Sequence, residues 1–257
     1  MCDQLSVTAL ETIAARGWRG TSTLRIGDWL LRAGSGFTGR ANSVLPLGSA
    51  GCPLDAALDQ VADFYAEQGL PPKIQMPLDE PGSPLSELDR ELQDRGWRRS
   101  DDAIVMIASL AALLEACPPD PTLPAASLEP VPSIGWLAGY HYRGRPLPPA
   151  AVAVLVNADS PVFASVSPAD GGDIAGVGRG VIDDGWLGVT AVTVGERHRR
   201  TGVGRQVMGE LGRWAADRAA HSVYLQVDSL NEVAVAMYGR LGFTQHHRYR
   251  YLSSPEA

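Results

Sequence analysis

Apolar and polar positions along the chain follow two spacings, one typical of helices and the other typical of strands. Apolar residues three and four positions apart, such as Leu10, Ile13 and Ala14, predict amphipathic helices. Alternating apolar runs bounded by turn residues predict strands. Helices are expected at residues 5–17, 54–69, 85–97, 133–142, 150–158, 202–219 and 231–241. Strands are expected at residues 23–34, 39–48, 73–78, 102–110, 161–168, 173–184, 185–195, 222–228 and 243–252, with a hairpin turn at residues 183–185.

A proline-rich segment separates two similar series of elements. The prolines of residues 113–132 disfavour a long helix or a central strand and predict a linker. On either side of it, "RELQDRGWRR" and "AMYGRLGFTQ" end a helix in glycine and an aromatic residue, and "IQMP" matches "LQVD". In this register Leu92 corresponds to Tyr238 and Leu85 to Asn231. The sequence therefore predicts a duplicated fold, with domains at residues 1–115 and 133–257 joined by a linker at residues 116–132.

Composition and charge exclude several classes of function. The chain of 257 residues has a formal net charge of -7, which argues against general nucleic-acid binding. Its three cysteines have no paired spacing, so neither a disulfide framework nor a metal site is expected. The N-terminus does not resemble a signal peptide, and no apolar run is long enough to predict a membrane span. We expect a cytoplasmic protein without a nucleic-acid or membrane partner, and the sequence does not predict its oligomeric state.

The segment "VTVGERHRRTGVGRQVM" at residues 192–208 passes from a strand through clustered cations into a helix. A helix start offers unpaired N–H groups and partial positive charge, and glycine allows an anion to approach the backbone closely. Arginine adds forked donors for phosphate oxygens. A Walker A loop would need a lysine, and a Rossmann loop would need glycine in place of Val207. The segment therefore predicts either a phosphate-binding loop of another kind or an ordinary tight turn.

Two motifs together resemble the GNAT superfamily of N-acetyltransferases. "RRTGVG" (199–204) matches its Arg/Gln-x-x-Gly-x-Gly/Ala signature, and "NEVAVAMYGRLGF" (231–243) matches its Asn-x-x-Ala-x-x-x-Tyr-x-x-x-Gly-Phe segment. The resemblance covers residues 160–252, and the first half shares only the order of strands and helices. It implies an α/β fold of the α+β type with two GNAT-like units, each a mixed, mostly antiparallel central sheet flanked by helices. The first unit would be degenerate and the second catalytic.

The resemblance also implies acetyl-CoA as cosubstrate and no metal. In the family the loop binds the diphosphate of the cofactor, while a strand edge pairs with its pantetheine arm in the manner of β-augmentation. The cofactor-binding residues carried over by this match are Val192, Thr193, Val194, Arg199, Arg200, Thr201, Gly202, Val203, Gly204, Arg205 and Asn231. Asn231 is also a natural helix N-cap. Tyr238 is expected to give a proton to the departing CoA thiolate, although a core aromatic would fit the same pattern.

The expected reaction is direct attack of a primary amine, from a small molecule or an amino acid, on the thioester. Ordered water is the leading candidate for the base, and the other candidates are Glu196, Asp228, His198, His246 and Asp183. Gln226 replaces a glutamate found in the superfamily's peptide N-terminal acetyltransferases, which argues against a peptide acceptor. The segment "WLAGYHYRGRP" (136–146) is expected to line the acceptor pocket. Arg143 and Arg145 in it are either ligands for a glutamate-like carboxylate or solvated.

Two other functions fit the same residues. A non-catalytic acyl-CoA sensor would account for the missing base and for the degenerate first half. A peptide N-terminal acetyltransferase would use the same cofactor loop with a different acceptor. Retention of Tyr238 favours an enzyme over a sensor, because a sensor does not need an acid for the thiolate.

Overall fold

The computed structural model describes residues 5–78, 80–142, 144–168 and 172–255. The first half of the chain forms α1 (Val7–Gly17), β1 (Ser22–Ile26), β2 (Trp29–Ala33), β3 (Ser43–Pro46), α2 (Leu54–Glu67), β4 (Lys73–Leu78), α3 (Pro84–Asp94), β5 (Arg98–Arg99), β6 (Ala103–Ser109) and α4 (Leu110–Ala116). The second half forms β7 (Ala126–Glu129), α5 (Ile134–Gly139), α6 (Ala151–Val156), β8 (Val162–Val166), β9 (Gly176–Asp183), β10 (Trp186–Val194), a 3-10 turn η1 (Glu196–His198), α7 (Val203–Ala216), β11 (Ser222–Asp228), α8 (Glu232–Arg240) and β12 (Thr244–Ser253). None of the helices described is long and apolar enough to cross a membrane.

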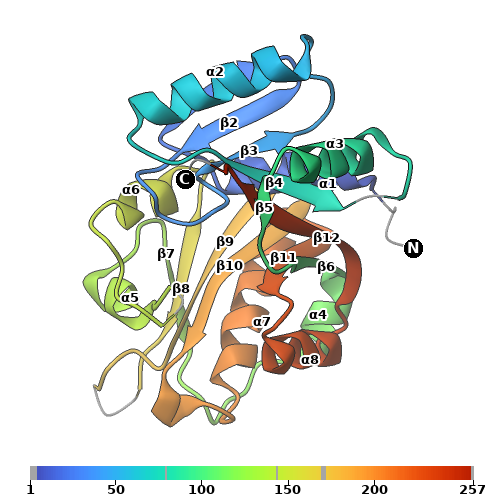
Figure 1. Ribbon diagram of the computed structural model, residues 1–257. Coiled ribbons are helices and arrows are strands. Elements are labelled where there is room, and N and C mark those ends of the chain that lie inside the picture. The colour runs from blue at the N-terminus through green and yellow to red at the C-terminus, as the bar shows by residue number, and fades with distance from the viewer. Residues whose placement is uncertain (1–4, 79, 143, 169–171, 256–257) are drawn as a thin grey trace.

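All the strands belong to one sheet that runs through both halves (Figure 1). Its order is β1-β2-β3-β4-β12-β6-β11-β10-β9-β8-β7, with β5 beside β12. Neighbouring strands are antiparallel except for two parallel pairs, β3 with β4 and β10 with β11. The expected mixed, mostly antiparallel sheet flanked by helices is therefore confirmed, with the strands of both units joined side by side.

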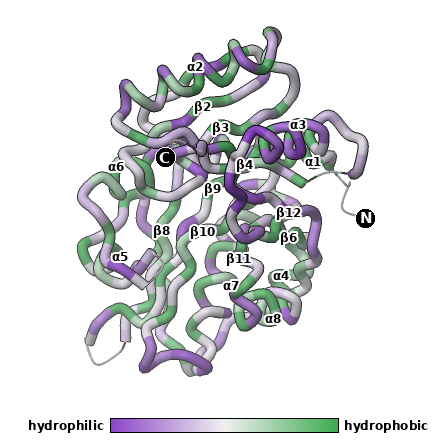
Figure 2. Tube along the Cα trace, in the orientation of Figure 1, coloured by the Kyte–Doolittle hydropathy of each residue, from purple (hydrophilic) through white to green (hydrophobic). Residues whose placement is uncertain are grey.

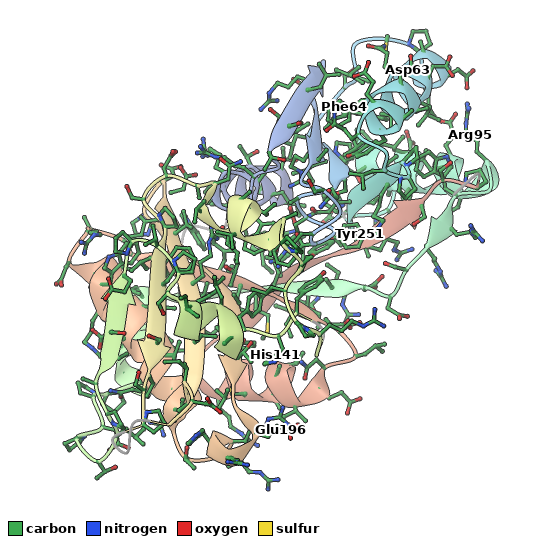
Figure 3. The ribbon with its side chains drawn as sticks, turned by 90° about the vertical axis from the view of Figure 1, so that its left-hand side faces the viewer. Asp63, Phe64, Arg95, His141, Glu196 and Tyr251 are labelled. Carbon is green, nitrogen blue, oxygen red and sulfur yellow. The ribbon has the colours of Figure 1, made fainter. Side chains whose placement is uncertain are left out.

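The two halves exchange their last strands. β6, from the first half, lies between β11 and β12 of the second half and pairs with both. In return β12 pairs with β4, the strand of the first half that corresponds to β11. Each half therefore depends on the other to complete its sheet. Figure 3 shows Tyr251 of β12 midway between Phe64, in the first half, and Glu196, at the far end of the second.

Helices cover both faces of the sheet because alternate strand residues point to opposite sides. In the second half one face buries Leu187, Val189 and Leu225 in a core shared with α7. The other face packs Trp186 and Tyr224 against α1, a helix of the first half. Green apolar positions concentrate along the strands and purple positions on α3 at the surface (Figure 2). The first half thus covers a face of the second half's sheet.

Three elements differ from the sequence-based expectation. Residues 23–34 form a hairpin of two strands, β1 and β2, because Gly27 adopts a φ of 53° that permits a tight turn. Helix α4, which the sequence analysis did not predict, follows β6 directly and ends at Ala116, the first residue of the expected linker. Strand β7 lies within residues 116–132 and pairs only with β8, as an edge strand beside prolines can.

Candidate functional site

β10 and β11 begin as a parallel pair and then separate. Their pairing ends at Val189 and Leu225, after which each strand keeps only its outer neighbour, β9 or β6. A bulge between Thr190 and Thr193, where Ala191 has a φ of 57°, bends β10 at the point of separation. The edge of residues 192–194 that faces β11 has no strand partner in the described part of the chain. This edge is available to an extended ligand.

The glycine loop follows directly at the end of β10. Gly202 has a φ of 93°, a left-handed conformation that favours glycine, and the 14-residue helix α7 begins at the next residue. The Thr201 hydroxyl donates to the carbonyl of His198 (2.7 Å), which holds the loop closed. A Cβ placed on Gly204 would lie 3.5 Å from Cγ2 of Val194. The free N–H groups of the helix start therefore lie beside the open strand edge.

The three arginines predicted to bind phosphate have different surroundings. Arg199 and Arg200 are exposed, and Arg199 forms an ion pair with the exposed Glu196 (3.7 Å). Arg205 instead donates from Nη2 to the carbonyl of Ala116 (2.9 Å), at the C-terminus of α4. The charges of Arg199 and Arg200 are thus exposed to solvent beside the loop. One donor of the Arg205 guanidinium is already bonded to the end of α4.

Two hollows flank the glycine loop, and the proline-rich segment forms a wall of each. A cavity of about 400 Å³ is lined by residues that include Leu123, His198 and Thr201. A smaller one of about 170 Å³ is lined by residues that include Asp120 and Gly202. Residues 118–124 therefore belong to the surroundings of the loop, a contribution that the sequence analysis did not predict.

Asn231 and Tyr238 lie at the two ends of α8. Asn231 is the N-cap, and its Oδ1 accepts from the N–H of Ala234 (3.1 Å), which leaves the side-chain NH2 group free for a ligand. Tyr238 is buried in the core shared with α7, and its ring meets Phe243 edge-on. Its hydroxyl makes no hydrogen bond to any described residue. Burial raises the pKa of Tyr238 to about 12, so this phenol stays protonated at neutral pH.

The three carboxylates considered as bases have other partners. Asp183 accepts from Arg16 (2.6 Å) at the hairpin that begins β10, the end of the strand away from the separation. Glu196 pairs with the loop arginine described above. Asp228 Oδ1 accepts from the N–H of Leu230 (3.0 Å) in the turn before α8. These partners leave ordered water as our proposal for the base.

The two histidines considered as bases, His198 and His246, lie in different places. His198 lies in the turn that leads into the glycine loop. His246 binds the carbonyl of Leu5 (2.8 Å) and His247 (2.8 Å), and His247 pairs with the buried Glu11 (2.9 Å). His246 and His247 therefore join β12 to α1, which indicates a structural role.

One residue of the segment expected to line the acceptor pocket lies in the core, whereas Tyr140 and Tyr142 of the same segment lie near Arg40. Trp136 is 1% exposed and donates to a carbonyl of β9, so it belongs to the core, contrary to expectation. Arg145 is exposed, and Arg143 lies outside the described residues. The residue that reaches Gln226 comes instead from the first half: Arg40 Nη1 donates to Gln226 Oε1 (2.9 Å). No sequence motif marks Arg40, because the loop between β2 and β3 is brought there only by the exchanged sheet.

No group of three or more histidine, cysteine, aspartate or glutamate residues suited to a metal occurs within the described ranges. The site is built from backbone N–H groups, an open strand edge, two amide side chains, a buried phenol and arginines. Such a set suits an anionic, elongated ligand with amide groups.

Comparison with known proteins gives a consistent family. Residues 6–252 match the protein family described as "Probable histone acetyltransferase Rv0428c C-terminal". The chain is 28% identical over 260 residues to the uncharacterized N-acetyltransferase YobR of Bacillus subtilis, covering 95% of this chain and 98% of the relative. It is 27% identical over 257 residues to the probable histone acetyltransferase Rv0428c of Mycobacterium tuberculosis, covering 96% and 74%.

Solved structures show the same fold at low identity. A GCN5-related N-acetyltransferase from Kribbella flavida superimposes with a TM-score of 0.66 at 17% identity, covering 97% of this chain and 95% of that one. A tandem GNAT protein from the clavulanic acid biosynthesis pathway gives a TM-score of 0.60 at 13% identity, covering 78% and 69%. The tandem arrangement therefore occurs in a protein with this fold.

Proposed function

The chain belongs to the acetyltransferase family of Rv0428c, within the GNAT superfamily, and from that premise we propose that it transfers the acetyl group of acetyl-CoA to a primary amine of a small molecule or an amino acid. The observation that carries the proposal is the separation of β10 from β11 beside the glycine loop. Acetyl-CoA supplies the acetyl group as a thioester. The remaining chemistry is assigned to residues of this chain.

In this proposal the second half holds the cosubstrate along one continuous surface. The backbone of Val192, Thr193 and Val194 hydrogen-bonds the amides of the pantetheine arm. The N–H groups from Thr201 to Arg205 bind the diphosphate, with charge from Arg199 and Arg200. Asn231 contributes its free NH2 group. The glycines at 202 and 204 allow the close approach that this binding needs.

Tyr238 is the proposed acid. The amine nitrogen attacks the thioester carbonyl, the C–N bond forms and the C–S bond breaks, and the Tyr238 hydroxyl gives its proton to the departing sulfur. The second proton that the nitrogen loses on becoming an amide returns to the Tyr238 phenolate through water. A phenol whose pKa is raised to about 12 by burial is protonated before the reaction, and it has no competing hydrogen bond among the described residues. An ordered water takes the proton that the attacking ammonium must lose.

A sensor function is the second candidate, and the arrangement of the carboxylates favours it. Each of Asp183, Glu196 and Asp228 has a partner within the chain, so none of these three candidates is free to act as a base. The free hydroxyl of Tyr238 favours the enzyme. The name of the mycobacterial relative adds protein lysines to the acceptors that require testing.

The experiment is release of free CoA thiol from acetyl-CoA in the presence of amines, amino acids and a histone-tail peptide, with the acetylated product identified by mass spectrometry. Turnover with an amine or an amino acid is the expected result. Tight acetyl-CoA binding without turnover on the whole panel would favour the sensor. Turnover on the peptide alone would replace the acceptor class, and absence of acetyl-CoA binding would contradict the proposal altogether.

A further inference from the structure

Two arginines lie over the same indole ring at the open end of β10 and β11. The Cζ atom of Arg40 lies 4.6 Å from the ring centroid of Trp18, and that of Arg179 lies 4.9 Å from it. Arg40 comes from the loop between β2 and β3 and Arg179 from β9, so the two halves each contribute one cation. Trp18 is held by a hydrogen bond from Nε1 to Thr38 Oγ1 (2.6 Å). The site therefore combines a fixed aromatic platform with two guanidinium groups.

Arg179 is buried, and its bonding is incomplete. It is 1% exposed, and it donates from Nε to the carbonyl of Leu155 (2.7 Å) and from Nη1 to that of Gly17 (2.9 Å), at the C-termini of α6 and α1. Its Nη2 has no hydrogen-bond partner among the residues that the structure describes. Desolvation lowers the pKa of Arg179 to about 9, a sign that the cation lacks a compensating anion.

Arg40 is half-buried and therefore accessible to a ligand. Apart from Gln226, Trp18 and Arg179, the neighbours that most affect its charge are the phenols of Tyr249, Tyr251, Tyr140 and Tyr142, which carry no charge at neutral pH. Burial acts to lower the pKa of Arg40, and the phenols raise it only at the high pH where they ionise. No described aspartate or glutamate lies within 4.0 Å of either arginine. Two cations against one indole ring, with no described carboxylate within 4.0 Å, are costly unless an anion binds near them.

Arg40 and Arg179 lie close to the place where we propose that the reaction occurs. Gln226, which accepts from Arg40, follows the last paired residue of β11, Leu225. Thr190, which accepts weakly from Arg179 (3.4 Å), follows the last paired residue of β10. Both arginines therefore reach the point where the strands begin to separate. A ligand held by these two arginines lies beside the end of the open strand edge, residues 192–194, that is proposed to bind the pantetheine arm.

We propose that Arg40, supported by the charge of Arg179, binds an anionic group of the acceptor, so that the substrate is a primary amine carrying a carboxylate or a phosphate in the same molecule. This inference rests on the proposed function. It assigns to the first half a direct part in acceptor recognition. It also disfavours basic peptides, because two arginines repel a lysine-rich acceptor.

The test compares matched acceptors that differ only in charge. Amino acids are set against their carboxamides, and phosphoethanolamine against ethanolamine, by thiol release and by calorimetric titration of the CoA-loaded full chain. We expect a charged member to be preferred, and the preferred pair shows whether a carboxylate or a phosphate is recognised. Arg40→Met raises the KM and Kd for the charged acceptor about 10- to 100-fold, as loss of a charge-assisted hydrogen bond does. It changes the values for the neutral partner less than about twofold.

Two further variants keep the result interpretable. Arg40→Lys retains the charge without the fork and has an intermediate effect. Arg25→Met removes an exposed arginine of β1 and changes nothing. Equal loss on charged and neutral acceptors, with unchanged acetyl-CoA affinity, would overturn the inference. Equal binding of both members of every pair would also overturn it. Binding of the charged acceptor that depends on Arg40 but gives no turnover would support the inference and contradict the proposed function instead.

Discussion

The two parallel strand pairs follow the same order of elements but differ in what lies between their strands. β3 leads through α2 to β4, and β10 leads through α7 to β11. Gln75 and Gln226 occupy corresponding positions, and each accepts a 2.9 Å hydrogen bond from an arginine: Arg32 in the first half and Arg40 in the second. Glu11 is an electrostatic neighbour of Arg32, whereas the strongest neighbours of Arg40 among the described residues include no carboxylate.

In the first half the charge is neutralised within the protein. Arg32 is 2% exposed and donates to Gln75, which in turn donates to the buried Glu11 (2.9 Å). Glu11 also accepts from His247 (2.9 Å) in the exchanged strand β12. The hydrogen-bonded series Arg32–Gln75–Glu11–His247 therefore places protein side chains at the strand pair β3–β4. A buried arginine with an internal counter-ion needs no ligand, whereas Arg40 and Arg179 do.

The helices of the two halves also differ at the positions that correspond to the proposed site. Leu92 of α3 is fully buried where α8 has Tyr238, and α2 begins after Pro53 where α7 begins after Gly202. The first half thus keeps the order of elements and lacks counterparts of the proposed phosphate loop and the proposed acid. In our proposal the first half is a support, which covers the second half's sheet and supplies Arg40.

Separating the halves gives the largest expected effect. A chain of residues 117–257 lacks β6, so β11 and β12 lose the strand between them and expose long edges. We expect it to aggregate or to show no cooperative thermal unfolding by circular dichroism. Coexpression with residues 1–116 should restore a folded complex. Cooperative unfolding of the isolated fragment would show that the exchanged strand is dispensable.

A pair of glycine variants tests the two loops. Gly202→Asp places a carboxylate and a side chain in a position with a φ of 93°, 3.1 Å from Leu123. We expect acetyl-CoA affinity to fall about 100-fold or more, through lost N–H contacts and charge repulsion. Gly51→Asp imposes similar backbone strain before α2, where φ is 73°, and should leave the affinity unchanged. Equal losses in both variants would mean that strain alone is responsible.

A pair of tyrosine variants separates catalysis from stability. Tyr238→Phe should lower kcat on the order of 100-fold and leave acetyl-CoA affinity intact, because it removes the acid. Tyr65→Phe removes a hydroxyl that donates to the carbonyl of Arg32 (2.9 Å) in the buried network. It should cost about 1–2 kcal/mol of unfolding free energy and leave kcat unchanged. Wild-type kcat in Tyr238→Phe would exclude it as the acid.

The smallest expected effect concerns pH at the contact between β12 and α1. Burial, and then the neighbouring His247, lower the pKa of His246, while the carbonyl of Leu5 and Glu11 partly oppose this. The unfolded chain therefore binds the proton first as pH falls below about 6.5, and stability declines. Denaturant unfolding at pH 7.5 and 5.5 should show this decline, and His246→Gln should reduce it. A variant with the wild-type pH dependence would place the titrating group elsewhere.

The sequence predicted most helices and strands because their periodicity is local. Its prediction of Asn231 as a helix N-cap is confirmed. The exchange of β6 and β12 was not predictable, because pairing between distant strands leaves no local pattern. Arg40 and Arg179 were missed for the same reason: each is a single charge in an ordinary loop or strand. Their proximity is apparent only in the folded chain, where both lie against the ring of Trp18.

The central claim is that one of two similar strand pairs binds acetyl-CoA and the other is closed. Calorimetric titration of the full chain with acetyl-CoA measures this directly through the stoichiometry. The account predicts one molecule bound per chain, because the pair β3–β4 is occupied by Arg32, Gln75 and Glu11. Two molecules per chain, or none, would contradict it.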